Sequence, residues 1–212
     1  MKALQNIAVG FLVSFIGSIP LGYLNVVGFQ IYKKSNINQL VFYLLGVVII
    51  EGFVIYATLL FAKKLSENEK LLKTISFLSI VFMLVLAIVF YVQLGNHDSS
   101  NQKNTPLQYA PFVMGLVLSA LNFVQIPFWI GWNLYLVNNK YIFVEKNLKF
   151  VYVLGTLIGT FCGMLGFVLL LQYFTNDNKN ISTKIVSTGI PLFFLIMTVV
   201  QAIKFWRKYY LK

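Results

Sequence analysis

The chain has few of the residues from which catalytic and metal sites are built. Its 212 residues include one cysteine, Cys162, and one histidine, His97, and only 11% are charged. One cysteine excludes an intramolecular disulfide and a cysteine zinc cluster, and one histidine in a polar stretch excludes most metal and catalytic-triad chemistry. The apolar segments also lack a histidine, a pair of acids or a nucleophile beside a base. We therefore expect no metal, no cofactor and no enzymatic activity.

Acidic residues are scarce as well, with six Asp and Glu against 17 Lys and Arg, and the net charge is +11. Binding to nucleic acid would require these basic residues to gather on one face. Instead they fall in short connections between apolar segments, where the cytoplasmic loops of membrane proteins carry excess Lys and Arg. The charge therefore indicates a lipid bilayer as the partner, and we expect no contact with nucleic acid.

Long apolar segments dominate the chain, which is 58% hydrophobic. A helix needs about 20 mainly apolar residues to cross the hydrocarbon core of a bilayer. The segments are too long for the strands of a barrel and do not alternate with a period of two. The sequence thus predicts an all-α membrane protein with six transmembrane helices. They are placed near residues 6–31, 39–62, 74–94, 109–137, 150–174 and 186–205.

The distribution of Lys and Arg predicts the orientation of these spans. With the N-terminus inside, 12 of the 17 basic residues lie on the cytoplasmic side and five on the other. The positive-inside rule assigns the side rich in Lys and Arg to the cytoplasm. We therefore expect both termini in the cytoplasm.

The pattern of the first span recurs in the fourth. A glycine, a serine four residues later and an Ile-Pro pair occur in Gly10–Asn25 and again, with two residues inserted, in Gly115–Pro127. The second spans correspond as well, because Leu45–Glu51 aligns with Leu154–Thr160. Thr160 is then the counterpart of Glu51.

This recurrence divides one transmembrane domain, residues 1–212, into repeat 1 (about 1–94), a connection (95–108) and repeat 2 (about 109–212). Each repeat has three spans, and an odd number of spans places the second repeat upside down relative to the first. Inverted repeats are typical of secondary transporters, whose sites lie at the repeat interface near mid-membrane. The alternative is that Gly, Ser and Pro recur only because they are common in membrane helices.

The first and fourth spans are predicted to be broken helices. Pro20 has no backbone N–H to donate to the helix, and a glycine on either side of it, one of them Gly22, weakens the helix further. Asn25 follows in the same apolar run. In the fourth span the interruption is expected at Asn122, Gln125 and Pro127. The amide side chains of Asn122 and Gln125 are expected to hydrogen-bond the backbone groups that the break frees.

Irregular backbone at membrane depth lies against protein or a water-filled cavity. The N-terminus of a resumed half-helix is positive enough to attract a substrate carboxylate. The glycines Gly155, Gly159 and Gly163 are spaced for close helix packing.

Glu51 lies near the centre of the second predicted span, and no basic residue shares its depth. A charged side chain there costs at least about 2.5 kcal/mol on insertion scales, which favours the neutral form of the carboxyl. Such a group is suited to carry a proton or to bind a cationic group of a substrate. The alternative is a protonated Glu51 that hydrogen-bonds a neighbouring helix and only holds helices together.

These segments resemble the lysine-exporter (LysE/RhtB-type) family of small bacterial inner-membrane exporters. Ser18–Asn25 (Ser-Ile-Pro-Leu-Gly-Tyr-Leu-Asn) is similar to the Pro-Gly-Pro-like motif of the family's first span, and Leu45–Glu51 to its Leu-Gly…acid pattern. Gly115–Asn122, followed by Ile126–Trp129, resembles the Gly…Asn-Pro motif of the fourth span, with Phe123 in the place of the proline.

The resemblance implies a multi-pass protein of the bacterial inner membrane that exports amino acids or related small metabolites by proton exchange. Its substrate and proton site is expected to include Glu51, Pro20, Gly22, Asn25, Asn122, Gln125, Pro127 and Thr160. The alternative is a membrane scaffold or assembly partner that transports nothing. The sequence leaves the substrate, the coupling ion and the existence of a homodimer open.

Overall fold

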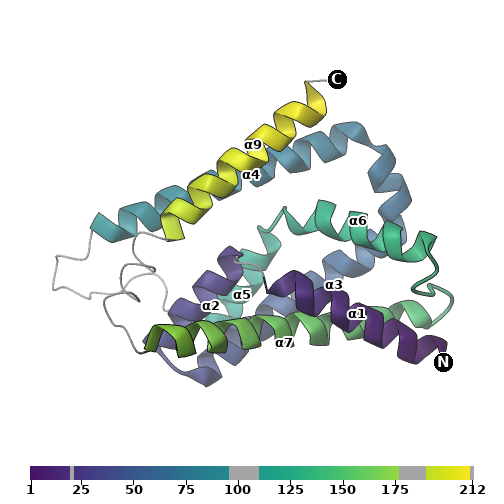
Figure 1. Ribbon diagram of the computed structural model, residues 1–212, viewed down its shortest axis with the longest axis horizontal. Coiled ribbons are helices and arrows are strands. Elements are labelled where there is room, and N and C mark those ends of the chain that lie inside the picture. The colour runs from purple at the N-terminus through teal and green to yellow at the C-terminus, as the bar shows by residue number, and fades with distance from the viewer. Residues whose placement is uncertain (20–21, 96–109, 177–189, 211–212) are drawn as a thin grey trace.

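A computed structural model describes residues 1–19, 22–95, 110–176 and 190–210 (Figure 1). The described residues form helices joined by short connections and contain no strand, which confirms the all-α prediction for this part of the chain. The helices are α1 (Lys2–Ser18), α2 (Tyr23–Lys34), α3 (Ile37–Glu67), α4 (Glu69–Gly95), α5 (Pro111–Ala120), α6 (Gln125–Asn138), α7 (Leu148–Asn176) and α9 (Ile190–Tyr209).

Two of the described helices are by themselves long and apolar enough to cross a membrane. They are α3 over Ile37–Ala62 and α7 over Leu148–Phe174. The pairs α1–α2 and α5–α6 raise the total to four if each bent pair is one span. The chain is therefore compatible with a membrane location, whereas the count of six spans stays a prediction. The predicted connection at 95–108 lies outside the described residues except for Gly95.

Both bent pairs turn sharply where the helix is interrupted. The axes of α1 and α2 differ by 75°, and those of α5 and α6 by 70°. At the first break Gly22 is extended, with φ −89° and ψ 156°, and Pro20 lies outside the described residues. At the second break α5 ends at Ala120 and α6 resumes at Gln125.

Pro127 does not interrupt the fourth span, contrary to the expectation from the sequence. It is the third residue of α6, in the first turn of that helix. Backbone N–H groups in a first turn have no partner within the helix, so a proline there removes no helical hydrogen bond. The break therefore precedes Pro127.

Glycines bring the backbones of two helix pairs into close contact. α1 packs along α7, and α5 packs along α3. A Cβ atom added to Gly155 would lie 2.6 Å from the carbonyl oxygen of Ile7, and one added to Gly10 would lie 2.7 Å from that of Tyr152. Gly46 of α3 and Gly115 of α5 face each other in the same way. The small residues set the distance between helices, as expected for packing in a bilayer.

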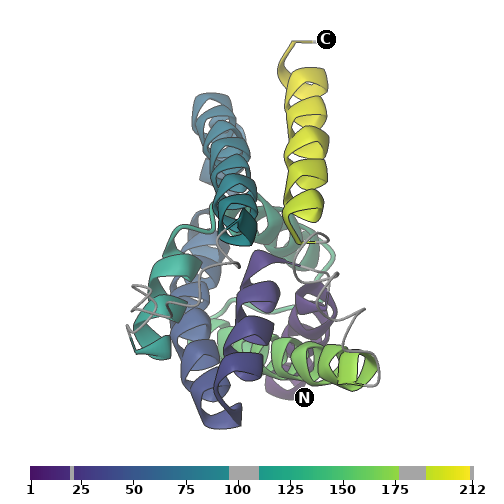
Figure 2. The ribbon, with the colours of Figure 1, turned by 90° about the vertical axis from the view of Figure 1, so that its left-hand side faces the viewer.

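The apolar core has two parts. One joins α2, the first half of α3, α4 and the second half of α7, and the fully buried Tyr43, Leu44 and Val168 lie in it. The other joins the second half of α3 to α6 and the first half of α7 around Trp129 and Tyr152. The helices α4 and α9 pack against each other and rise above the remaining helices in both views (Figures 1 and 2).

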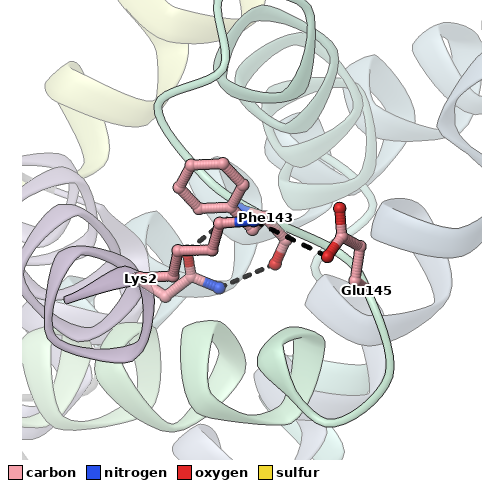
Figure 3. A network of polar contacts seen from close by, with 4 residues as sticks. Lys2, Phe143 and Glu145 are labelled. Carbon is pink, nitrogen blue, oxygen red and sulfur yellow. Dashed lines mark hydrogen bonds and ion pairs between the residues drawn. The ribbon is translucent and has the colours of Figure 1, made fainter.

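Hydrogen bonds join the start of α1 to the connection between α6 and α7. Asn6 is fully buried, and its side chain donates to the carbonyl oxygens of Phe143 and Leu148 at 2.8 Å each. It also accepts a hydrogen bond from the backbone N–H of Phe143 at 3.0 Å. Lys2 lies over the Phe143 ring and 3.7 Å from Glu145 (Figure 3). These contacts hold α1 at a fixed height along α7.

We expect Gly155→Ala to lower the free energy of unfolding by about 1–3 kcal/mol, because the added methyl overlaps the backbone of α1 at Ile7. Gly166→Ala is the matched control on the same helix, since a Cβ atom there meets nothing within 4 Å. The control should be neutral, or stabilising by up to about 1 kcal/mol through helix propensity. Thermal unfolding of the detergent-purified protein measures both, and equal effects would contradict the close contact.

Candidate functional site

A cavity of about 250 Å³ lies where the two helix breaks face each other. Its polar lining comes from α1, α2, α3, α6 and α7 and from the break between α5 and α6, and consists of Ser14, Ser18, Asn25, Glu51, Asn122, Gln125 and Thr160. Its apolar lining includes Tyr23, Phe128 and Trp129 and three methionines, Met83 of α4, Met164 of α7 and Met197 of α9. The cavity volume corresponds to roughly eight water molecules at ~30 Å³ each, which suits a small metabolite.

Among the described residues that line the cavity, Glu51 is the only acid. It is partly buried on α3, and its Oε1 accepts a hydrogen bond of 3.2 Å from the indole Nε1 of Trp129 on α6. The Thr160 side chain on α7 is its second hydrogen-bond partner. Three helices from both halves of the chain thus meet at one carboxyl group.

A chain of hydroxyl groups continues from this carboxyl towards α1. The hydroxyls of Thr160 and Ser14 are 2.5 Å apart, and both side chains are buried. When Glu51 is ionised, Thr160 donates to it and accepts from Ser14. When Glu51 is protonated, its own O–H donates to Thr160, and Thr160 then donates to Ser14. The same groups therefore satisfy both protonation states of the carboxyl.

No cation neutralises Glu51 within the described part of the chain. The described residues of the cavity lining include no Lys, Arg or His. The ion pair of the described residues joins Lys2 to Glu145, which are both exposed and do not line the cavity. An ionised carboxylate in apolar surroundings is costly unless a charge or several hydrogen bonds compensate it. Two hydrogen bonds to neutral groups are the compensation that the protein supplies here.

Side-chain amides bridge both helix breaks. Asn25 donates to the carbonyl oxygen of Ser18, at the end of α1, over 2.7 Å. Gln125 donates to the carbonyl oxygen of Ser119, near the end of α5, over 2.9 Å. The last carbonyl groups of a helix have no partner within it. At the second break the Ser119 carbonyl also accepts the backbone N–H of Asn122 at 3.0 Å, so Gln125 is an additional donor to it. Both amides lie at the wall of the cavity.

The N-terminus of α6 does not suit a substrate carboxylate, which corrects the expectation for this half-helix. The backbone N–H groups of Gln125 and Ile126 already donate to Asn122 and Phe123 at 3.3 Å each. Pro127, the third residue, has no N–H. The first turn of α6 thus presents its dipole but none of the donors that would bind an anion.

The structure brings most of the predicted site residues to the cavity. Those that line it are Gly22, Asn25, Glu51, Asn122, Gln125 and Thr160. Pro127 is exposed and is not part of the lining, and Pro20 lies outside the described residues. Ser14 and Trp129 were missed as site residues. The recurrence of Ser14 as Ser119 in the two repeats was the signal available for the serine, and the signal for Trp129 was its place in the Ile126–Trp129 segment of the fourth span.

A second polar cluster lies further along α3, between the cavity and the Lys2–Glu145 pair. Tyr152 donates to Asn133 Oδ1 at 2.9 Å, and Asn133 Nδ2 donates to the hydroxyl of Thr58 at 3.0 Å. All three side chains are buried. These hydrogen bonds tie α3, α6 and α7 together one to two turns beyond Glu51. Among the described residues, no three His, Cys, Asp or Glu lie together as metal ligands would.

We expect Thr160→Val to destabilise the protein by about 1–3 kcal/mol, because it leaves the buried Ser14 hydroxyl and the Glu51 carboxyl without their shared partner. Thr156→Val is the control one turn earlier, since its hydroxyl bonds only the Val153 carbonyl of its own helix. Thermal unfolding of both variants tests the network. A loss at Thr156 as large as that at Thr160 would contradict it.

Comparison of the chain with protein-family models, with curated proteins and with solved structures finds no match.

Proposed function

We propose that this chain is a secondary-active exporter of amino acids or related small metabolites that exchanges its substrate for protons. The observation that carries this proposal is the position of Glu51. Its carboxyl lines a metabolite-sized cavity at the junction of both helix breaks, has neutral hydrogen-bond partners and shares the lining with no cation among the described residues. A carboxyl in this setting binds a proton or a substrate amine, one at a time, because either one neutralises it.

Exchange follows from that competition. When a substrate ammonium group enters the cavity from the cytoplasm, Glu51 releases its proton to that side and the resulting carboxylate pairs with the ammonium group. After the substrate leaves on the other side, Glu51 takes up a proton there and the empty cavity returns in a neutral form. Trp129, Thr160 and Ser14 keep the carboxyl in one orientation in both states. The bent helices are the elements proposed to open and close around the site.

The packing of the helices supports two inverted repeats. α1 packs on α7 and α5 on α3, so the first span of each repeat contacts the second span of the other. A Cβ atom added to Gly10 would meet the backbone of Tyr152–Thr156, and one added to Gly115 would meet that of Tyr43–Val47. The separation in sequence between Tyr43–Val47 and Tyr152–Thr156 equals the separation between the aligned segments Leu45–Glu51 and Leu154–Thr160. Glu51 and its counterpart Thr160 then lie side by side at the repeat interface.

The ends of the helices support an orientation with both termini in the cytoplasm. The N-terminus lies beside the α6–α7 connection, where Lys2 contacts Glu145. The start of α4 lies beside the end of α9, where Lys73 is 4.5 Å from the centre of the Tyr210 ring. The N-terminus and the α3–α4 and α6–α7 connections lie at the right-hand end of the molecule in Figure 1. These are segments with the excess of Lys and Arg, which is typical of cytoplasmic loops.

We expect Glu51→Gln to reduce transport driven by a pH gradient by about tenfold or more, because an amide neither binds a proton nor pairs with an amine. The assay uses the purified protein in lipid vesicles, with labelled amino acids and amines that the unaltered protein is first shown to carry. Glu145→Gln is the control, since that carboxyl is exposed and pairs with Lys2. Unchanged flux in Glu51→Gln would refute the proposed role.

The competing proposal is a membrane scaffold in which the same residues only pack helices. It differs in whether water reaches the cavity. In a Cys162→Ser background, cysteines at positions 22, 51 and 125 should react with a membrane-impermeant thiol reagent, because these residues line the cavity. Val168→Cys, at a fully buried position, should not react. Protection at all three cavity positions from both sides of the membrane would favour the scaffold.

A further inference from the structure

The lining of the cavity is asymmetric in charge, with one acid and no base. In the part of the lining that the structure describes, Glu51 is the only charged side chain, and Lys, Arg and His are absent. A zwitterion such as an amino acid brings a carboxylate as well as an amine. That carboxylate would lose its hydration without gaining a cation, which is unfavourable in an apolar site. The donors of the α6 first turn are already used by Asn122 and Phe123, so this half-helix does not replace the missing cation.

The rest of the lining suits an apolar group. Met83, Met164 and Met197 reach the cavity from α4, α7 and α9. Thioethers are polarisable and adapt to the shape of a ligand, and they contact aromatic rings favourably. Three methionines from three helices therefore form a wall for an apolar or aromatic body rather than for a second charge.

An aromatic ring lies near the acid. Phe128 lines the cavity, is 38% exposed, and packs edge-on against Trp129, with 5.3 Å between ring centres. The indole of Trp129 is buried and holds the Glu51 carboxyl. An ammonium group is attracted both by a carboxylate and by the face of an aromatic ring. Phe128 thus adds to the preference of Glu51 for a cation and adds nothing for an anion.

From these observations we propose that the cavity selects organic monocations, namely amines with an apolar or aromatic body and no carboxylate. The ammonium group binds Glu51, and the body lies against Phe128 and the methionines. This inference rests on the proposed function, and it narrows the substrate from amino acids in general to amines without an acid group.

Equilibrium binding to the full-length protein tests the selectivity without any transport step. The probes share one ring and differ in charge: 2-phenylethylamine is a cation, L-phenylalanine a zwitterion and 2-phenylethanol neutral. Calorimetry in detergent at one pH, corrected for partition into empty micelles, gives their affinities. We expect the amine to bind about tenfold or more tightly than either of the others. Phenylalanine or phenylethanol binding as tightly as the amine, or no binding of the amine, would overturn the inference.

Two variants locate the binding on the proposed groups. Glu51→Gln should weaken binding of 2-phenylethylamine by about tenfold or more and leave 2-phenylethanol unchanged. Phe128→Leu should weaken the amine by a few-fold, whereas Phe174→Leu, at an aromatic residue 68% exposed on α7, should not. Equal affinity of the amine for Glu51→Gln and the unaltered protein would overturn the inference.

The failure of this inference is distinguishable from failure of the proposed function. If the protein binds the amine but carries no flux under a pH gradient, the proposal of an exporter is rejected and the proposal of cation selectivity stands. If the protein binds phenylalanine tightly and transports it, the proposal of an exporter stands and the proposal of cation selectivity is rejected.

Discussion

One carboxyl group without a cation is the constraint on which the site depends. Glu51 lies inside an apolar helix, where ionisation is costly, and its partners are an indole and a hydroxyl instead of a lysine or arginine. A permanent ion pair would fix its charge. Neutral partners leave the charge free to change, and they hold the carboxyl in place in either state. The cavity beside it leaves space for a small ligand at that one group.

The network around Glu51 requires α1, α3, α6 and α7 to meet at one depth. Glycines allow this, because the backbones of α1 and α7 are in contact at Gly155 and those of α3 and α5 at Gly46. Larger residues would separate the helices and break the 2.5 Å contact between Ser14 and Thr160. The hydrogen bonds of Asn6 to the α6–α7 connection fix the position of α1 along its own axis, so that Ser14 lies opposite Thr160.

The helix breaks have a structural cost that the side-chain amides of Asn25 and Gln125 offset. Each break leaves carbonyl groups at the end of a helix without a partner, and in a bilayer no water is available outside a cavity to satisfy them. Asn25 donates to the Ser18 carbonyl, and Gln125 donates to the Ser119 carbonyl, which also accepts the backbone N–H of Asn122; both amides line the cavity at the same time. Closing motions of the bent helices would have to replace these hydrogen bonds, which links the shape of the backbone to the contents of the site.

The sequence by itself determined the all-helical architecture and indicated that two of the apolar segments are interrupted, because apolar length and the clustering of Gly, Pro and amides are local properties. It also indicated Glu51, since a lone acid in an apolar run is visible without a fold. The tertiary structure alone decided that Trp129, Thr160 and Ser14 surround that acid and that Pro127 lies outside the cavity. These facts depend on the rotation of each helix about its axis. That rotation is set by contacts between residues far apart in the chain, which no local pattern specifies.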